Sequence, residues 1–486
     1  MRYLDAQQRE QIGFSYILDS LRIITNIGMQ FKRELMPFGI KKTGQLKREL
    51  DDIGAVIEKI LKQSEIEYDI GEALCKIKDI SGSVRRLLHG NAMDDVELYE
   101  IKYFAKVSED IRRAYLESGV LAEGVELHCL EEVFALLDPE EKKLTTFHIY
   151  DIYSDTLREI REAKRELEKK ISGLLGQEES RSLLDERLQY VVAEEEEERR
   201  IRIELSDKLR GYAEKILQNL TCIGRLDFLI AKSRYLMEQG AVRPTITDGE
   251  RLYLKNASNP MVKDILQKNK KRFTEISIEM AQGATIITGA NMGGKSVTIN
   301  TITLNVLLAQ MGFYVFCEEA EIPVYDFVYF ISDDMQSVER GLSTFGAEII
   351  QLRTVVGASR VAKGFIALDE LARGTNPKEG RDIVQAIIYF LRDKKVNALI
   401  STHYDGIDVK GSRHYQVVGL KHLDFEKLKY QIDLNKKASV DIIQQNMDYH
   451  LEEAGENEIP KDALNIALLL GLDSEILNII KNFYKE

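Results

Sequence analysis

A glycine-rich segment, TGANMGGKS at residues 288–296, has the spacing of a phosphate-binding loop. Gly289 is followed, after four intervening residues, by Gly294, Lys295 and Ser296, which is the G-x-x-x-x-G-K-[ST] pattern. Glycines allow backbone N–H groups to face phosphate oxygens, and the first turn of a helix adds partial positive charge. We therefore predict that Lys295 contacts the β- and γ-phosphates of a nucleotide and that Ser296 binds Mg²⁺.

Two carboxylates, Asp369 and Glu370, follow the apolar run GFIAL and suit the other half of a hydrolytic site. A carboxylate at the tip of a strand beside a phosphate loop can hold the Mg²⁺ shell, and we predict this role for Asp369. Glu370 is predicted to act as general base on the attacking water. Paired acids after a strand are also common in solvated turns, so the catalytic interpretation depends on the accompanying phosphate loop.

A third apolar run, NALIST at residues 397–402, ends directly before His403. A single histidine is more often structural than functional. This one follows a predicted strand that should lie beside the strand of Asp369. We therefore predict that His403 contacts the γ-phosphate or the attacking water.

The segment SVERGLSTFGAEI, residues 337–349, lies between the phosphate loop and Asp369. Ser343 and Thr344 precede a helix that is predicted to start near Phe345, and Ser343 is well suited to cap it. A hydroxyl at a helix N-terminus can also contact an anion. ATPases of the ABC class carry a similar sequence, which contacts the γ-phosphate held by the opposite subunit. We predict this contact in trans for Ser343 and Thr344.

The elements that must position these residues differ along the chain. Residues 1–150 have apolar side chains at intervals of three and four, which predicts a helical core. Residues 151–240 are highly charged and free of proline, and their heptad-like apolar spacing predicts two helical arms. We expect these arms to pack as an antiparallel coiled coil or against other helices. The break between them is predicted within LLGQEESRS, residues 174–182.

A Gly- and Pro-containing stretch, residues 240–250, marks the predicted domain boundary. From residue 284 on, β-like runs alternate with helical patterns, which predicts that residues 241–438 form an α/β P-loop domain with a mainly parallel sheet. Its strand candidates are ATIIT, YVFCEEAEIPVYDFVYFIS, GFIALDE and NALIST. Residues 439–486 are predicted to return to helix.

Composition excludes several classes of protein. The formal net charge of −13 gives no support for nucleic acid or an anionic membrane as partner, although a local basic groove remains compatible with it. The four cysteines are far apart, which fits a reducing interior without a disulfide framework or zinc site. Neither a signal peptide nor an apolar run of membrane-spanning length is found. We expect a cytoplasmic protein without a membrane partner.

The segments TGANMGGKS, SVERGLSTF, LDELARGTNPKEG and STHY, in this order and spacing, resemble the ATPase domain of MutS proteins. The Asn291-Met292 pair inside the phosphate loop is a specific mark of that family. The likeness extends upstream through GFSYILDSL, DTLREIREAKRELEKK and RLDFLIAKSRYLMEQGAVRP, and covers most of the chain. Within the family, the chain is most similar to the bacterial branch that often bears a C-terminal Smr domain.

This resemblance implies a homodimeric ATPase related to ABC proteins, with ATP and Mg²⁺ bound in two composite sites. Each site would join one phosphate loop to Ser343 and Thr344 of the other subunit. In addition to the residues above, the resemblance gives Asn291, Met292, Gly293 and Val297 nucleotide contacts. It implies a loop that couples the two sites at Arg373 and Thr375, and a base-stacking aromatic for which Phe273 is the candidate. The segment ALNIALLLGLDSEILNII resembles the C-terminal dimerisation helices.

The departures from the family bear on the partner. We find no equivalent of the domain that inserts a phenylalanine into mismatched DNA, and we expect no Smr domain after Glu486. Residues 171–192, which separate the two arms where relatives carry a DNA clamp, leave little room for one and hold no basic cluster. One hypothesis is a DNA-directed ATPase switch related to mismatch repair or recombination control. The alternative is an ATP-driven remodeller of a protein client, such as a reactivase for an adenosylcobalamin-dependent aminomutase.

Overall fold

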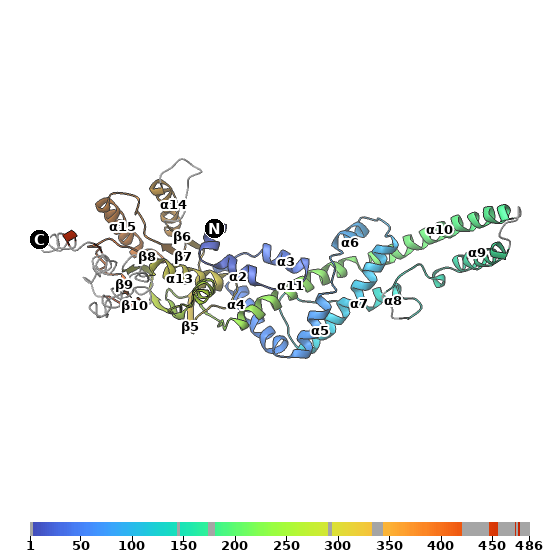
Figure 1. Ribbon diagram of the computed structural model, residues 1–486, viewed down its shortest axis with the longest axis horizontal. Helices are drawn as coiled ribbons and strands as arrows, with labels where there is room; N and C mark the ends of the chain where they lie inside the picture. The colour runs from blue at the N-terminus through green and yellow to red at the C-terminus, as the bar shows by residue number, and fades with distance from the viewer. Residues whose placement is uncertain are drawn as a thin grey trace. The chain divides into compact units, whose positions relative to one another are not determined.

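The computed structural model of the chain describes residues 3–142, 146–173, 180–289, 294–332, 344–419, 447–454, 472 and 475–476 (Figure 1). The chain divides into two compact units. The first unit contains Met1–Leu21, Met36–Asp51 and Tyr235–Glu486, and the second contains Arg22–Leu35 and Asp52–Arg234. The predicted boundary at residues 240–250 lies close to Tyr235, but the prediction of consecutive domains does not include the N-terminal segments that join the first unit.

The second unit is helical within the described residues. Its helices are α3 (Asn26–Arg33), α5 (Ser64–Leu74), α6 (Ser81–Leu88), α7 (Asp95–Ser118), α8 (Glu131–Leu136), α9 (Asp155–Gly173), α10 (Ser180–Arg210) and most of α11 (Ala213–Glu238), with short turns η2 (Ile57–Leu61) and η3 (Asp151–Tyr153). Helix α4 (Thr43–Val56) begins in the first unit and ends in the second. The long helix α7 starts at a capping box of Asp94 and Glu97 and ends at Gly119, whose φ of 65° suits a glycine.

Helices α9 and α10 lie side by side and run antiparallel (Figure 1). Arg161 on α9 joins them, because its guanidinium pairs with Glu194 at 2.9 Å and with Glu198 at 2.7 Å. Lys164 adds a second ion pair with Glu194. Helix α9 runs to Gly173 and α10 starts at Ser180, and most of the predicted break at residues 174–182 lies outside the described residues. Part of the acidic run at residues 194–198 therefore joins the two helices. From its charge pattern alone, a solvent-exposed helix face was also expected.

The first unit contains two sheets. The larger has the strand order β10-β9-β4-β8-β7-β6, in which every neighbouring pair is parallel except β10 and β9. Its strands are β4 (Gly283–Thr288), β6 (Phe327–Ile331), β7 (Gly364–Leu368), β8 (Val396–Ser401), β9 (Arg413–Gly419) and β10 (Asp448–Glu453). The smaller sheet has the order β1-β5-β2-β3 and contains β1 (Thr245–Thr247), β2 (Leu252–Ala257), β3 (Ile276–Met280) and β5 (Glu319–Pro323).

The helices of the first unit are α1 (Ala6–Gln11), α2 (Phe14–Ser20), η1 (Ile40–Lys42), α12 (Pro260–Lys268), α13 (Lys295–Gln310), α14 (Thr344–Ser359) and α15 (Pro377–Arg392). Together with the sheets they form the predicted α/β region after a largely helical one. Within the described ranges, none of the helices is both long and apolar enough to cross a membrane.

Two sequence predictions are corrected here. The long apolar run of residues 314–332 was expected as one strand candidate, but it separates into β5 and β6, which belong to different sheets. The prediction of helix over residues 439–486 is wrong for Asp448–Glu453, which form β10 and pair with β9. Tyr415 and Val417 on β9 supply the non-local partners, and local apolar spacing does not reveal such a pairing.

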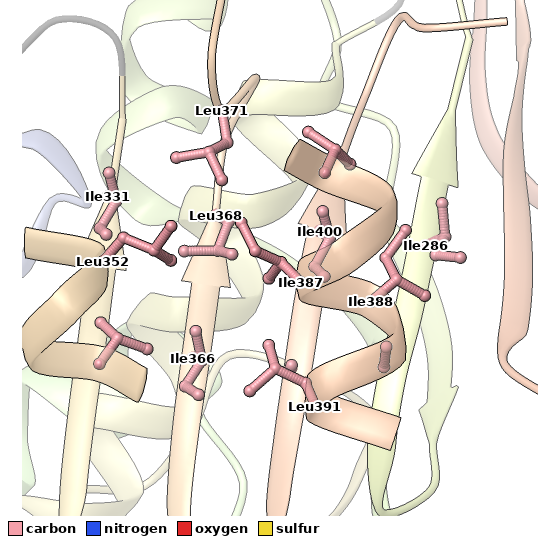
Figure 2. Close-up of a cluster of buried hydrophobic side chains, with 14 of the residues drawn as sticks. Ile286, Ile331, Leu352, Ile366, Leu368, Leu371, Ile387, Ile388, Leu391 and Ile400 are labelled. Carbon is pink, nitrogen blue, oxygen red and sulfur yellow. The ribbon is translucent and has the colours of Figure 1, made fainter. Parts of the chain in front are cut away.

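The core beside the larger sheet explains why its central strands are buried along their whole length. Figure 2 shows Ile366 and Leu368 of β7 and Ile400 of β8 in contact range of α15 side chains, including Ile388 and Leu391. All residues of β4, β7 and β8 are buried, as expected for parallel strands covered on both faces. These strands end at the same edge of the sheet, so the segments that follow Thr288, Leu368 and Ser401 meet there.

Candidate nucleotide site

The phosphate-loop sequence connects strand β4 to helix α13, as the motif requires. Gly294 caps α13 with a φ of 82°, a left-handed conformation that favours glycine. A Cβ atom there would also lie 2.9 Å from the ring of Tyr449 on β10. The predicted contacts Asn291, Met292 and Gly293 lie outside the described residues.

Lys295 is the first residue of α13 and is buried, with 2% of its surface exposed. Its ammonium donates to the Gly289 carbonyl at 2.8 Å and lies 3.2 Å from a carboxylate oxygen of Glu370. A buried ammonium needs such partners, because an unpaired charge is costly away from water. The structure thus brings together the predicted phosphate ligand and the predicted general base.

Asp369 lies between two serine hydroxyls. The Ser401 hydroxyl at the end of β8 donates to Asp369 Oδ1 at 2.5 Å, and Ser296 at the start of α13 also hydrogen-bonds this carboxyl. Burial raises the pKa of Asp369, and the hydrogen bonds from Ser401 and Ser296 oppose that shift. A carboxylate and a hydroxyl in contact are hard oxygen donors of the kind that Mg²⁺ takes, so Asp369 and Ser296 fit the predicted ion.

Glu370 is surrounded by cationic and polar groups. Arg373 lies 3.3 Å and His403 Nδ1 lies 3.9 Å from its Oε2 atom. Burial lowers the pKa of His403, although the charge of Glu370 opposes this shift, so the imidazole is neutral at pH 7. Among the described residues, Nδ1 of His403 has no hydrogen-bond partner although it is buried. It is therefore available to a group that enters the site.

The other predicted residues lie as follows. Ser343 is outside the described residues, and Thr344 opens helix α14. Val297 stands in the first turn of α13, and Thr375 lies near Glu379, 3.4 Å from its carboxylate. Phe273 has the Lys263 ammonium 6.0 Å from its ring, and no contact among the described residues joins it to the phosphate loop. Its predicted stacking on the base stays a prediction.

Two residues of this region were not predicted from the sequence. Tyr449 lies against Gly294, but it stands on β10, in a segment expected to be helical. Ser401 is buried and bridges the two carboxylate residues, since its Oγ also accepts the Glu370 N–H at 3.0 Å. The sequence signal that could have identified Ser401 is its position at the end of an apolar run, two residues before His403.

Replacing Ser401 with alanine is expected to raise the Mg²⁺ concentration needed for half-maximal ATP hydrolysis about tenfold. The lost hydrogen bond favours the ionised form of Asp369, and bonds to charged groups contribute ~1.5–3 kcal/mol. Without it the pKa of Asp369 rises further, so the acid limb of the pH–rate profile should move to higher pH. Titrations of Mg²⁺ and pH measure both effects.

The matched control is Ser359→Ala, a buried serine on α14 that bonds only a backbone carbonyl of its own helix among the described contacts. It should leave both titrations unchanged. An unchanged Mg²⁺ requirement in Ser401→Ala would mean that this hydroxyl does not support the metal ligand.

Comparison with known proteins agrees with this geometry. The model of the family MutS domain V matches residues 285–470. Endonuclease MutS2 of Lactiplantibacillus plantarum is 27% identical over 472 residues, which cover 82% of this chain and 59% of that protein. Endonuclease MutS2 of Lactobacillus gasseri is 32% identical over 47% of this chain and 29% of its own length. That of Finegoldia magna is 28% identical over 62% of this chain and 36% of its length.

The chain therefore spans less than two thirds of each of these relatives. The match to domain V covers the phosphate loop, Asp369, Glu370 and His403, and proteins of this family are ATPases. From its motifs, its family match and its relatives, the chain belongs to the MutS family, in the MutS2 branch.

Proposed function

We propose that this chain is a Mg²⁺-dependent ATPase that works as a dimeric conformational switch. The observation that carries the proposal is the meeting of Lys295, Asp369 and Glu370 at the ends of strands β4 and β7. Lys295 lies 3.2 Å from Glu370, and the Asp369 carboxyl hydrogen-bonds Ser296 next to Lys295, which supports one site for the proposed phosphate ligand, metal ligand and base. Positioning and electrostatic stabilisation of this kind account for most of the catalysis in phosphoryl transfer.

In the proposed reaction, Lys295 and the N-terminus of α13 hold the phosphates. Ser296 and Asp369 would hold Mg²⁺, which would neutralise charge at the phosphate oxygens. Glu370 accepts a proton from the attacking water, whose oxygen bonds to the γ-phosphorus. The bond from that phosphorus to the bridging oxygen breaks, and ADP leaves with its electron pair. His403, neutral at pH 7, hydrogen-bonds the γ-phosphate or the water.

The dimer supplies the remaining contacts in this proposal. Ser343 and Thr344 of one subunit reach the γ-phosphate held by the other, and the loop with Arg373 and Thr375 couples the two sites. Support comes from the family match over this region. Residues 241–438 form the ATPase domain and the C-terminal segment takes part in dimerisation.

The charges of α9 and α10 favour a protein client over DNA as the partner of the arms. Most of the arginines on these helices are paired with carboxylates of the same unit: Arg158 with Asp155, Arg161 with Glu194, Arg187 with Glu168, Arg200 with Glu197 and Arg202 with Asp95. A DNA-binding surface instead presents cations to the phosphates. The other candidate is a DNA-directed switch, because the similar proteins are named Endonuclease MutS2.

One experiment tests both levels of the proposal. ATP hydrolysis by the purified chain is measured with and without Mg²⁺, and with double-stranded DNA from 50 to 200 mM salt. We expect Mg²⁺-dependent hydrolysis that DNA does not stimulate, with DNA affinity near the non-specific range of ~10⁻⁴–10⁻⁶ M. A rate that is independent of Mg²⁺ would contradict the ATPase mechanism. Tight DNA binding with a steep salt dependence would instead establish the DNA-directed switch.

A further inference from the structure

The turn that carries the predicted general base has an unusual backbone. Glu370 has a φ of 49° and Ala372 a φ of 63°, both in the left-handed region that non-glycine residues rarely adopt. Leu371 between them is buried in the core beside the sheet. Strained residues of this kind persist only where surrounding contacts hold them, and they gather at active sites and switch regions.

Three side chains, from α14 and from the segment at the end of β8, hold this turn through its backbone groups. The Ser401 hydroxyl at the end of β8 accepts the Glu370 N–H at 3.0 Å. A carboxylate oxygen of Glu348 on α14 accepts the Ala372 N–H at 3.0 Å. The Tyr404 hydroxyl, next to His403 in the chain, donates to the Ala372 carbonyl at 2.7 Å. Each polar backbone group of Ala372 is therefore satisfied by a side chain distant in sequence.

Tyr404 and the turn of Ala372 pack tightly against Gly380 of helix α15. A Cβ atom on Gly380, in the first turn of α15, would lie 2.2 Å from the Tyr404 hydroxyl and 2.9 Å from the Ala372 carbonyl oxygen. Burial, with the charges of Glu348 and Glu370, raises the pKa of Tyr404, so its hydroxyl remains a donor. Glu348 and Tyr404 are both buried, at 7% and 8% exposure.

We propose that Glu348 is a positioning residue for the general base, linking helix α14 to the turn of Glu370 and Ala372. The inference rests on the proposed ATPase function. In that function α14 follows the segment that contacts the nucleotide of the opposite subunit. Glu348 lies one turn into α14, so a displacement of this helix moves the atom that holds Ala372. Binding of ATP by one subunit thereby sets the position of Glu370 in its partner.

The contact of Glu348 suits this role because both the acceptor and the turn are buried. A buried N–H that lost its acceptor would be costly, so the turn follows the helix closely. Glu348 stands on α14, whereas the phosphate loop leads into α13, and Glu348 has no part in the proposed chemical step. A purely structural role would predict lower stability without any dependence on the partner subunit.

The test uses mixed dimers in which one subunit carries Lys295→Ala and binds ATP poorly. The other subunit carries wild-type sequence, Glu348→Ala or Glu348→Gln, and its kcat is measured. With wild-type sequence, the Lys295→Ala partner should lower kcat about tenfold, within the usual range of coupling between sites. With Glu348→Ala, kcat should already be about tenfold lower in the homodimer, and the Lys295→Ala partner should add less than a twofold change.

Glu348→Gln keeps an acceptor oxygen of the same size and should retain most of the coupling. Tyr404→Phe removes the second hold on Ala372 and should lower kcat without changing the affinity for an ATP analogue more than twofold. Equal factors from the Lys295→Ala partner, with or without Glu348→Ala, would overturn the inference. So would a wild-type kcat in the Glu348→Ala homodimer. Absence of hydrolysis by the wild-type dimer would instead contradict the proposed function itself.

Discussion

Glu370→Gln is expected to lower kcat for ATP hydrolysis about 10²–10⁴-fold while ATP still binds. A glutamine has the same shape but cannot accept the proton of the attacking water, and positioned bases contribute this magnitude. The neighbouring geometry should survive, because Ser401 contacts the backbone of Glu370 and not its side chain. The amide oxygen can still accept a hydrogen bond from Lys295, which lies 3.2 Å from the carboxylate.

Because hydrolysis is slowed, the Glu370→Gln variant should accumulate as an ATP-bound dimer. Single-turnover hydrolysis measures the chemical step, and size-exclusion chromatography with and without ATP measures the dimer. The matched control is Glu72→Gln on α5, an exposed glutamate of the other unit whose carboxylate pairs with Lys76 at 2.5 Å. It should hydrolyse ATP at the wild-type rate. Hydrolysis unchanged by Glu370→Gln would show that another group serves as the base.

Much of the candidate site was predictable because its residues follow apolar strands. Asp369 directly follows β7, His403 follows β8 after one residue, and Lys295 ends the loop that follows β4. Since parallel strands end at the same edge of a sheet, three separate motifs were expected to meet. The structure does bring Lys295, Glu370 and His403 together, while their chemical roles stay predictions.

The parts that were missed depend on contacts between distant residues. Strand β10 has no strongly apolar face, and it forms by pairing with β9, so Tyr449 could not be placed beside Gly294 from local sequence. The N-terminal segment joins the first unit through contacts such as Gln8, whose amide donates to the Phe330 carbonyl. Neither periodicity nor propensity reports such pairings.

The long apolar run of residues 314–332 shows the same limit. Tyr325 lies between the end of β5 and the start of β6. Its backbone N–H donates to the side-chain oxygen of Gln310 at 3.2 Å. The Tyr325 hydroxyl donates to Asn397 on β8. These buried polar contacts separate the two strands, and an apolar count cannot show them.

Lys295→Met is expected to weaken ATP binding about 10–100-fold, because a charge-assisted hydrogen bond to phosphate contributes ~1.5–3 kcal/mol. Methionine keeps the buried apolar stem of the side chain and removes the charge. A fluorescent ATP analogue measures the affinity. The same substitution should also lower the free energy of unfolding, because Glu370 is 8% exposed and would lose its buried cation.

The size of that destabilisation follows from what remains around Glu370. Removing one partner of a buried ion pair costs ~3–5 kcal/mol. Arg373 lies 3.3 Å from the carboxylate, but its side chain is half exposed and offsets only part of the loss. We expect about 2–3 kcal/mol, measured by urea unfolding.

The double variant Lys295→Met/Glu370→Gln separates the two effects of the lysine. With the buried carboxylate neutralised, the loss of stability should fall below ~1 kcal/mol, because no unpaired charge remains. ATP affinity should stay as weak as in the single Lys295→Met variant, since the phosphate contact is still missing. Additive losses of stability would show that the Lys295–Glu370 pair does not contribute to the fold. Restored ATP binding would show that the lysine serves the phosphates only by neutralising Glu370.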